Sequence, residues 1–295
     1  MINLKHSINV FIGGCSFGIL STFVKLAYSN GYSPSEVIGS QYFVGAILFW
    51  TVLFFSHKSK VSISMGLKLL VAGMPMALTG IFYYISLQYL DASIAIVLLF
   101  QFTWMGMMFE WIIEKNRPTK KSIGSVLLLF LGSIFSVNLF GTSLQDVSMT
   151  GVIWGLLAAI SFTTFIYVSA RVGKEVPPML KSSLMATGAF LITFIIFPPV
   201  FLVEGTFING LWIWGLLLGF FGVVLPPLLF SISMPKIGSG LGTILSASEL
   251  PMAILMSIIV LHEVVNFIQW IGVFIVLFGI VYPYLKVSTT RKKVA

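Results

Sequence analysis

The sequence has little charge. Lys, Arg, Asp and Glu together make up only 9% of its 295 residues, whereas an ordinary soluble domain has roughly 25%. Hydrophobic residues reach 58%, and the mean hydropathy is +1.03. So few charged side chains cannot cover the surface of a water-soluble particle of this size, which excludes most soluble enzymes and regulators. We therefore expect the chain to lie in a lipid bilayer.

Cysteine and histidine are also scarce. The single cysteine, Cys15, lies in an apolar run, and His6, His57 and His262 lie far apart in the sequence. This excludes an intrachain disulfide and a cysteine-based metal site, and it argues against a histidine metal site. The sequence contains no glycine-rich phosphate loop with lysine, no H-E-x-x-H and no nucleophile elbow. We expect no cofactor, no metal and no enzymatic activity, so an ion or solute gradient must supply any driving force.

Long apolar runs make up most of the sequence. A bilayer core of ~30 Å needs about 20 apolar residues per helix, and ten such runs follow one another in the sequence. Their limits are 8–28, 36–55, 67–87, 93–113, 122–140, 151–170, 180–200, 211–234, 240–261 and 267–284. The first run resembles the apolar part of a signal peptide, but no small-residue cleavage site follows it, so we expect it to be retained. The fold class is then an all-α integral membrane protein with ten transmembrane helices.

The basic residues orient these helices. The net charge is +8, and all but one of the 17 Lys and Arg residues lie at the N-terminus, in every second connection or after the last run. Because Lys and Arg near span ends are held on the cytoplasmic side, both termini are predicted to be cytoplasmic. The clusters do not form one polar face, so we expect no nucleic-acid partner. The exception is Lys25, near the outer end of the first span.

The two halves of the sequence resemble each other. Six residues of 34–54 are identical to residues 143 positions later, and Ser16-Phe17 recurs as Ser161-Phe162. Each half also ends in a Glu followed by a glycine-containing apolar run. Because five spans is an odd number, the second copy must enter the membrane from the opposite side, as in many secondary transporters. We predict a first repeat over 1–140, an external linker over 141–150, a second repeat over 151–286 and a basic cytoplasmic tail over 287–295.

These features resemble a known family. Ten spans, two five-span halves and the stretch from Ser246 to Tyr282, with Glu249-Leu250-Pro251 and Glu263 at its marked positions, are similar to the EamA-type proteins of the drug/metabolite transporter superfamily. The resemblance implies export or exchange of small metabolites, commonly amino acids, amines or sugars, by alternating access. The sequence departs from the family at Gln101-Phe102-Thr103, where a Glu-Pro-type element would fall, and at Gln41, where many members carry a basic residue.

Two ionisable residues lie deep within the predicted spans, away from the span ends. Glu249 lies about ten residues into the ninth span, which at ~1.5 Å per residue places it near the bilayer centre. A carboxyl group there is a candidate to take up and release a proton in each transport cycle. Alternatively, Glu249 only braces a kink beside Pro251. Lys25 lies roughly 12 Å from Glu249 in depth, and it either binds an anionic group of the substrate or extends to the interface.

Uncharged polar and aromatic residues within the spans complete the candidate site. An amide is costly in lipid and can bind a carboxylate or an amine, which favours Gln41 and Gln101 as substrate contacts. Aromatic rings suit an apolar side chain or a cation, although many pack between helices or anchor at the interface. Hydroxyl groups often bond to their own helix instead. The further candidates for substrate binding are Tyr42, Tyr83, Tyr84, Trp104, Ser161, Thr164, Tyr167 and Ser248.

The sequence thus predicts a secondary active transporter that exports or exchanges a small metabolite, with an amino acid or amine favoured, across a bacterial cytoplasmic membrane. Its partners would be the small-molecule substrate, the lipid bilayer and, through Glu249, protons. One alternative is an uncoupled facilitator in which Glu249 is structural. The other is a polytopic membrane enzyme or scaffold that acts on lipid-linked substrates.

Overall fold

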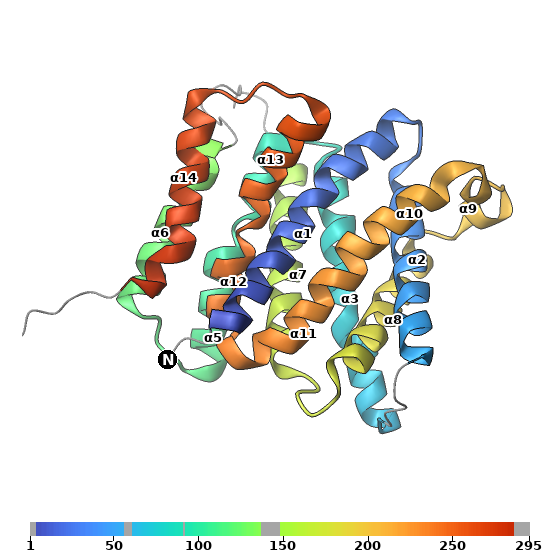
Figure 1. Cartoon of the computed structure of the whole chain (residues 1–295), viewed down its shortest axis with the longest axis horizontal. Coiled ribbons are helices and arrows are strands. Elements are labelled where there is room, and N and C mark those ends of the chain that lie inside the picture. Colours follow the sequence, from blue (N-terminus) through green and yellow to red (C-terminus); the bar gives the residue numbers. More distant parts are fainter. Residues whose placement is uncertain (1–3, 56–60, 91, 137–147, 286–295) are drawn as a thin grey trace, which may run out of the picture.

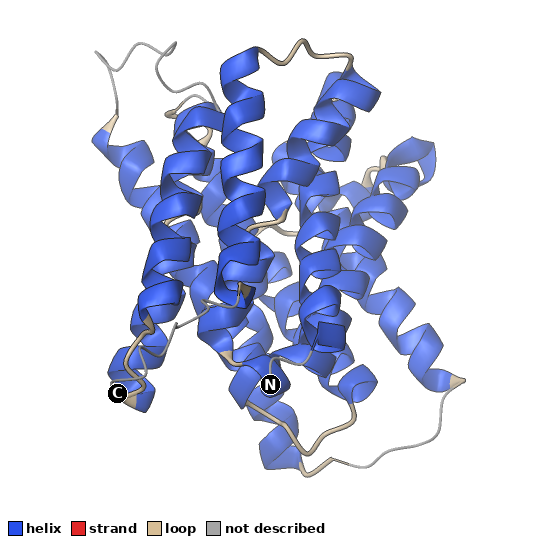
Figure 2. Ribbon diagram, turned by 60° about the vertical axis from the view of Figure 1, so that its left-hand side comes forward, coloured by secondary structure: helices blue, strands red, loops and turns tan. Residues whose placement is uncertain are grey.

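Every regular element in the described part of the chain is a helix (Figures 1 and 2). The computed structural model describes residues 4–55, 61–90, 92–136 and 148–285. The first half contains α1 (Leu4–Ser29), α2 (Pro34–Phe54), α3 (Ile63–Ser86), α4 (Ala92–Leu99), α5 (Phe102–Glu114) and α6 (Lys120–Ser136). The second half contains α7 (Met149–Arg171), α8 (Pro178–Ile196), α9 (Val200–Val203), η2 (Phe207–Leu211), α10 (Trp212–Leu218), η3 (Gly219–Val224), α11 (Leu225–Ile237), α12 (Ser239–Ser246), α13 (Glu249–Leu261), α14 (Phe267–Val281) and η4 (Tyr282–Tyr284).

Nine candidate membrane spans are found among the described residues, by length and apolarity. They match nine of the ten predicted runs. The remaining run falls on α6, which is described over 17 residues and packs against α14. Its predicted end, residues 141–147 of the linker predicted over 141–150, and the basic tail lie outside the described residues, so the count of ten spans stays a prediction.

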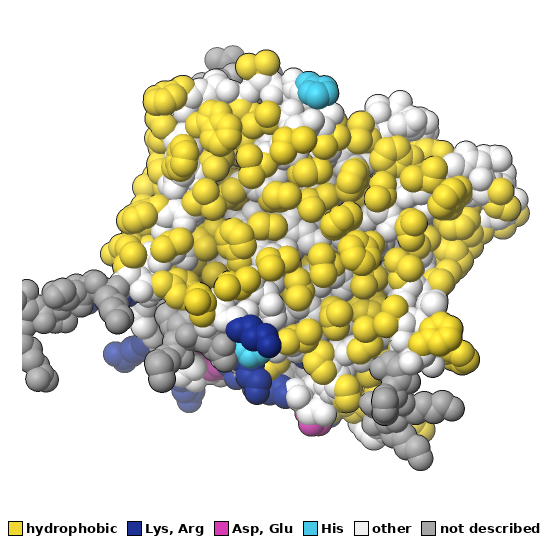
Figure 3. All heavy atoms as spheres, in the orientation of Figure 1, with side chains coloured by type: hydrophobic (Ala, Val, Ile, Leu, Met, Phe, Trp, Pro, Cys, Tyr) yellow, Lys and Arg dark blue, Asp and Glu magenta, His cyan; other side chains and the backbone are white. Residues whose placement is uncertain are grey.

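Charge divides the bundle into two ends. α1 begins and α14 ends at the same end, toward the bottom of Figure 1. Because successive spans alternate in direction, all described Lys and Arg residues other than Lys25 belong to this end. Figure 3 shows a broad hydrophobic surface with Lys and Arg gathered at its lower rim. We call this the basic end and the other the opposite end; that the basic end faces the cytoplasm stays a prediction.

The helices of the first half recur in the second. α4, α5 and α6 begin 147 residues before α12, α13 and α14 respectively. α4 and α12 have 8 residues each, and α5 and α13 have 13 each. Lys115 and His262, also 147 residues apart, follow α5 and α13 in the left-handed conformation, with φ of 59° and 54°. The two-repeat architecture predicted from the sequence is therefore confirmed.

The fourth and ninth spans are each interrupted near their middle. The breaks lie at Phe100-Gln101, between α4 and α5, and at Ala247-Ser248, between α12 and α13. Pro251 is the third residue of α13, a position whose backbone N–H has no partner within a helix, so it begins a new helix rather than kinking a continuous one. Non-helical backbone at membrane depth is tolerated where it is buried in protein or lines a cavity.

Contacts between the two repeats are more extensive than those within either. α6 packs against α14, α3 against α7 and α8, and α1 against α11 and α13. Glycine makes the closest of these contacts possible. A Cβ atom added at Gly73 of α3 would overlap the carbonyl group of Met185, and one at Gly188 of α8 would overlap that of Leu70. The backbones of α3 and α8 are therefore in direct contact.

Candidate functional site

A cavity of about 270 Å³ lies between α1, α2, α3 and the break of the ninth span. Its residues on α1 run from Phe17 to Tyr28, and those on α3 from Met76 to Tyr84, so the cavity occupies the half of the bundle nearer the opposite end. Gln41 and Glu249 are the polar groups that line it at mid-depth. The residues that line it are Phe17, Gly18, Leu20, Ser21, Val24, Lys25, Tyr28, Ile38, Gln41, Tyr42, Met76, Thr79, Gly80, Tyr83, Tyr84, Leu87, Ile96, Leu99, Phe162, Gly222, Glu249 and Ala253.

Aromatic rings close the cavity toward the basic end. Phe17 and Phe162, the phenylalanines of the repeated Ser-Phe pair, meet edge to face with ring centroids 5.5 Å apart. Phe102 contacts Phe162 at 4.8 Å, and Phe230 contacts Phe17 at 5.9 Å. Because the repeat-equivalent rings touch each other, they mark the centre of the two-repeat arrangement. These rings therefore form the wall of the cavity that faces the basic end.

Small residues on α1 place Glu249 beside the cavity. A Cβ atom at Gly14 would come within 2.7 Å of the carbonyl oxygen of Ser246, and one at Gly18 within 2.9 Å of the amide nitrogen of Ala253. α1 thus lies directly on the break between α12 and α13, a close approach that such small-xxx-small spacing allows. The Ser248 hydroxyl, in the break, donates to the carbonyl oxygen of Phe11 at 2.7 Å and ties it to α1.

The Glu249 carboxyl group has no hydrogen-bond or ion-pair partner among the described residues, although its side chain is only partly exposed. The residue begins α13, where the free N–H groups of the first turn favour negative charge. An ionisable group at this depth without a protein partner is costly unless a proton or a ligand neutralises it. The side chain is therefore available to a proton or to a cation.

Gln41 reaches the same cavity from α2 and is 7% exposed. Its amide, too, has no hydrogen-bond partner among the described residues. The neighbouring π-helical turn, η3, approaches α2 through glycine: a Cβ atom at Gly222 would lie 2.7 Å from Gln41 Nε2. Pro226 follows η3, and a proline there removes a helical N–H and crowds the carbonyl four residues earlier, which accounts for the irregular turn.

Tyrosine rings form much of the remaining wall. The Tyr42 hydroxyl donates to the carbonyl oxygen of Met76 at 3.0 Å, which leaves its ring facing the cavity. Tyr84 lies between Tyr28 and Tyr83, each with ring centroids 6.2 Å away. These surfaces suit an apolar body or a cation held over a ring.

Six of the predicted substrate contacts do not line this cavity. Gln101 donates to the carbonyl oxygen of Val97 and accepts from the indole of Trp104, both at 2.8 Å. Thr164 donates to its own helix at Ile160, and the Tyr167 ring contacts Phe109. Ser248 is bonded to α1 as described above.

Ser161 has a structural role instead. Its hydroxyl donates to the carbonyl oxygen of Pro75 at 2.8 Å. Ser16, its counterpart in the first repeat, donates to the carbonyl oxygen of Phe221 at 2.6 Å. Each serine thus donates to a carbonyl group in the third span of the other repeat, in keeping with the general tendency of buried hydroxyl groups to bond to backbone.

Lys25 lies at the mouth of the cavity and forms an ion pair with Glu263, with Nζ and Oε1 3.0 Å apart. This pairing was not predicted from the sequence. Other lining residues of α3, such as Met76 and Thr79, were missed, although Tyr83 and Tyr84 of the same span were predicted as substrate contacts and line the cavity. The only signal was the density of tyrosines near the end of that span.

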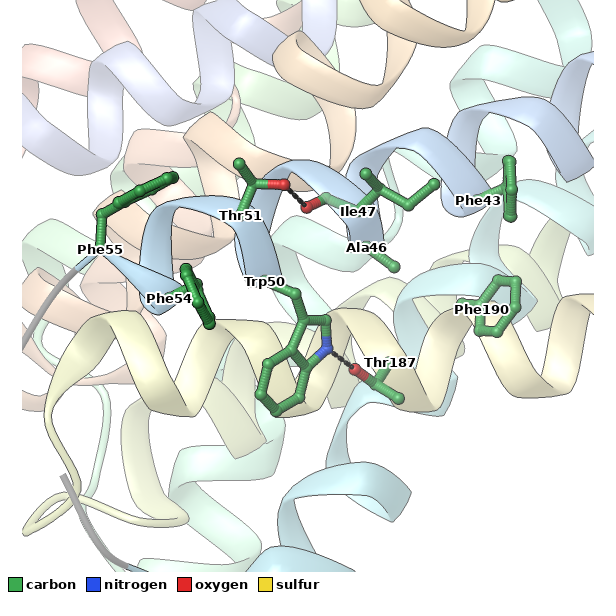
Figure 4. Close-up of a pocket in the computed structure, with 9 residues that line it drawn as sticks. All are labelled: Phe43, Ala46, Ile47, Trp50, Thr51, Phe54, Phe55, Thr187 and Phe190. Atoms are coloured by element: carbon green, nitrogen blue, oxygen red, sulfur yellow. Dashed lines mark hydrogen bonds between the residues drawn. The ribbon is translucent and has the colours of Figure 1, made fainter. Parts of the chain in front are cut away.

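A second, larger hollow lies on the outside of the bundle (Figure 4). It has a volume of about 590 Å³ and is formed by α2 and α8, with Phe43, Phe54 and Phe190 among its walls. Trp50 also lines it, but the indole N–H of Trp50 is already hydrogen-bonded, since Nε1 donates to Thr187 Oγ1 at 2.8 Å. Among the described residues, no ionisable side chain lines this groove, which suits contact with hydrocarbon rather than recognition of a polar solute.

The described residues contain no group of three or more His, Cys, Asp or Glu that could hold a metal ion. Broken membrane helices around a largely apolar cavity that holds a carboxyl and an amide group, in a bundle of two repeats, define an integral membrane protein with the architecture of a transporter. The chain belongs to the EamA-like transporter family, whose family model matches residues 5–138 and 149–284. It is thus a multi-pass membrane protein of the drug/metabolite transporter superfamily.

No curated protein matches the chain. Solved structures do: one chain, described only as a crystal structure of a protein, is similar over 94% of this chain and 96% of its own length, with a TM-score of 0.74 and 13% sequence identity. At this identity the likeness concerns the fold alone.

Proposed function

We propose that the protein exports or exchanges a small amine or amino acid across the bacterial cytoplasmic membrane by alternating access, coupled to protons through Glu249. The observation that carries this proposal is the pairing of Glu249 and Gln41 in one cavity, both without protein partners among the described residues. A substrate ammonium group can satisfy both side chains, since a carboxylate accepts hydrogen bonds and an amide accepts and donates them.

The lining of the cavity fits the same class of solute. Tyrosine and phenylalanine rings surround the two polar groups, so the polar groups can bind the amine of a ligand while the rings contact its apolar body. Release of a bound amine leaves the Glu249 carboxyl group in a setting of low polarity, which favours uptake of a proton before the cavity closes. One proton then returns for each substrate cation that leaves.

Purified protein in proteoliposomes tests this function. The vesicles would hold a mixture of amino acids, polyamines, nucleosides and sugars, with a pH gradient across the membrane, and mass spectrometry would identify what leaves. We expect amines or amino acids to leave these vesicles faster than they leave liposomes that hold the same mixture but no protein. If no solute leaves faster under either direction of gradient, the proposal is wrong, and the alternative of an enzyme or scaffold for lipid-linked substrates gains support.

Gln41→Leu should weaken substrate binding more than Gln101→Leu does. A hydrogen bond to a charged ligand is worth about 1.5–3 kcal/mol, so removal of the Gln41 amide should raise the apparent KM for transport by about tenfold or more. Gln101 is bonded within its own span, and its replacement should leave KM within about twofold while lowering thermal stability. Concentration-dependent uptake by the two variants checks this, and an equal rise in KM would remove Gln41 from the binding site.

A further inference from the structure

Two ion pairs join the repeats, one at each end of the bundle. At the opposite end, Lys25 of α1 pairs with Glu263, two residues after α13. At the basic end, Arg171, the last residue of α7, pairs with Glu114, the last residue of α5. These are the ion pairs that the structure shows within its described residues.

The two pairs are built in the same way from opposite repeats. In each, a basic residue in the C-terminal part of a repeat's first helix meets an acidic residue at the end of the broken span of the other repeat. Because the two repeats are inverted, equivalent positions lie at opposite ends of the bundle, so the same arrangement places one ion pair at each end. Lys25 also lines the mouth of the cavity, while Glu114 and Arg171 lie beyond the phenylalanine floor, on the path to the basic end.

The surroundings of the two pairs differ. The side chains of Lys25 and Glu263 are 54% and 46% exposed, whereas those of Arg171 and Glu114 are 33% and 14% exposed. Exposed pairs contribute little because water screens them, but a largely buried carboxylate that loses its partner is strongly destabilised. Glu110, one turn before Glu114, adds a second link at the basic end, since its carboxylate accepts from the amide of Gly240 at 2.6 Å. The basic end is therefore held more firmly than the opposite end.

We propose that Lys25–Glu263 and Glu114–Arg171 are the two latches of the transport cycle, both formed in this structure: the second must break for the cavity to open at the basic end, and the first, which lies at its mouth, must break for it to open at the opposite end. The proposal rests on the alternating access proposed above. It assigns to these four residues control of access rather than contact with the substrate.

Cysteine accessibility tests the latches without any substrate. Cys15 is the only cysteine of the chain, so Cys15→Ala gives a clean background. Ser21→Cys reports on the cavity, which Ser21 lines, and Thr163→Cys reports on the α5–α7 interface, where the buried Thr163 hydroxyl faces the carbonyl oxygen of Phe102. Labelling by a membrane-impermeant maleimide would be measured from each side of oriented vesicles. Lys174→Gln and Glu204→Gln, exposed charges at the two ends, are the controls.

We expect Glu114→Gln to raise labelling of the Thr163→Cys reporter from the basic side several-fold and to lower that of the Ser21→Cys reporter. Lys25→Gln should raise labelling of the Ser21→Cys reporter and leave the Thr163→Cys reporter protected. The charge exchange Lys25→Glu with Glu263→Lys should restore the original labelling. Unchanged labelling, or a rise of both reporters together in each variant, would overturn the latches. Since no solute is needed, a shift in labelling without solute flux would support the latches while contradicting the proposed substrate transport.

Discussion

Glu249→Gln should abolish proton-driven flux while leaving exchange of solute for solute in place. Gln has nearly the shape of Glu and can still accept a hydrogen bond, but its amide does not take up a proton at the pH values of a transport assay. The side chain has no protein partner among the described residues, so its replacement removes no internal contact. Flux under an imposed pH gradient should fall about tenfold or more, whereas counterflow without a gradient should persist. Parallel measurements in proteoliposomes separate the two modes.

Glu204→Gln is the matched control for that experiment. Glu204 is an exposed carboxyl group following α9, away from the cavity, and its replacement should change neither mode of transport. If Glu249→Gln retains full sensitivity to the pH gradient, Glu249 does not couple protons. The protein would then be an uncoupled facilitator, with Glu249 as a structural residue.

Gly73→Ala should destabilise the protein more than a single added methyl group usually does. A Cβ atom at this position overlaps backbone atoms of Met185, which belong to another helix and cannot rotate away. α3 and α8 would have to separate, and overpacking of this kind costs about 1–3 kcal/mol or more. We expect a lower melting temperature in detergent and a reduced yield of monodisperse protein.

Gly66→Ala, in the same helix, should have the opposite effect. Nothing lies within 4 Å of a Cβ atom added there, and Ala is favoured over Gly in a helix interior by roughly 1 kcal/mol. The melting temperature should stay the same or rise slightly. Equal destabilisation by both substitutions would show that the cost comes from α3 itself and not from its contact with α8.

The fold was largely predictable because bilayer thickness fixes the length of each apolar run. The repeat was predictable as well: Ser16-Phe17 and Ser161-Phe162 recur in the sequence, and Phe17 and Phe162 meet in the structure. The break in the ninth span was predicted only as a kink beside Pro251, and the break in the fourth span was not predicted. Pro251 marks only the second one, and the corresponding position in the first repeat is Trp104, so no residue type signals the break at Gln101.

Part of the candidate site was predictable from tyrosine rings, since Tyr42, Tyr83 and Tyr84 line the cavity, and part from the cost of a polar group in lipid. That argument selected Gln41 and Glu249, which line one cavity, but it also selected Gln101, whose amide is satisfied within its own span. The difference in depth along the helices argued against a Lys25–Glu249 pair, but it did not identify Glu263 as the partner of Lys25. Which residue beyond the end of a span meets Lys25 depends on the tertiary arrangement. Lys181 shows the same limit. It was assigned to a connection, yet it is 1% exposed and donates to the carbonyl oxygen of Ser169 at 2.8 Å, near the end of α7.

The dominance of contacts between the repeats has a consequence for biogenesis. When the ribosome has completed the first five spans, α3 has neither α7 nor α8 to pack against, and α6 lacks α14. The surfaces of Gly73 and the other close-contact glycines then face lipid without a partner helix. The first half must therefore wait in the membrane in a loosely associated state until the second half is inserted, and its packing is complete only when α14 covers α6.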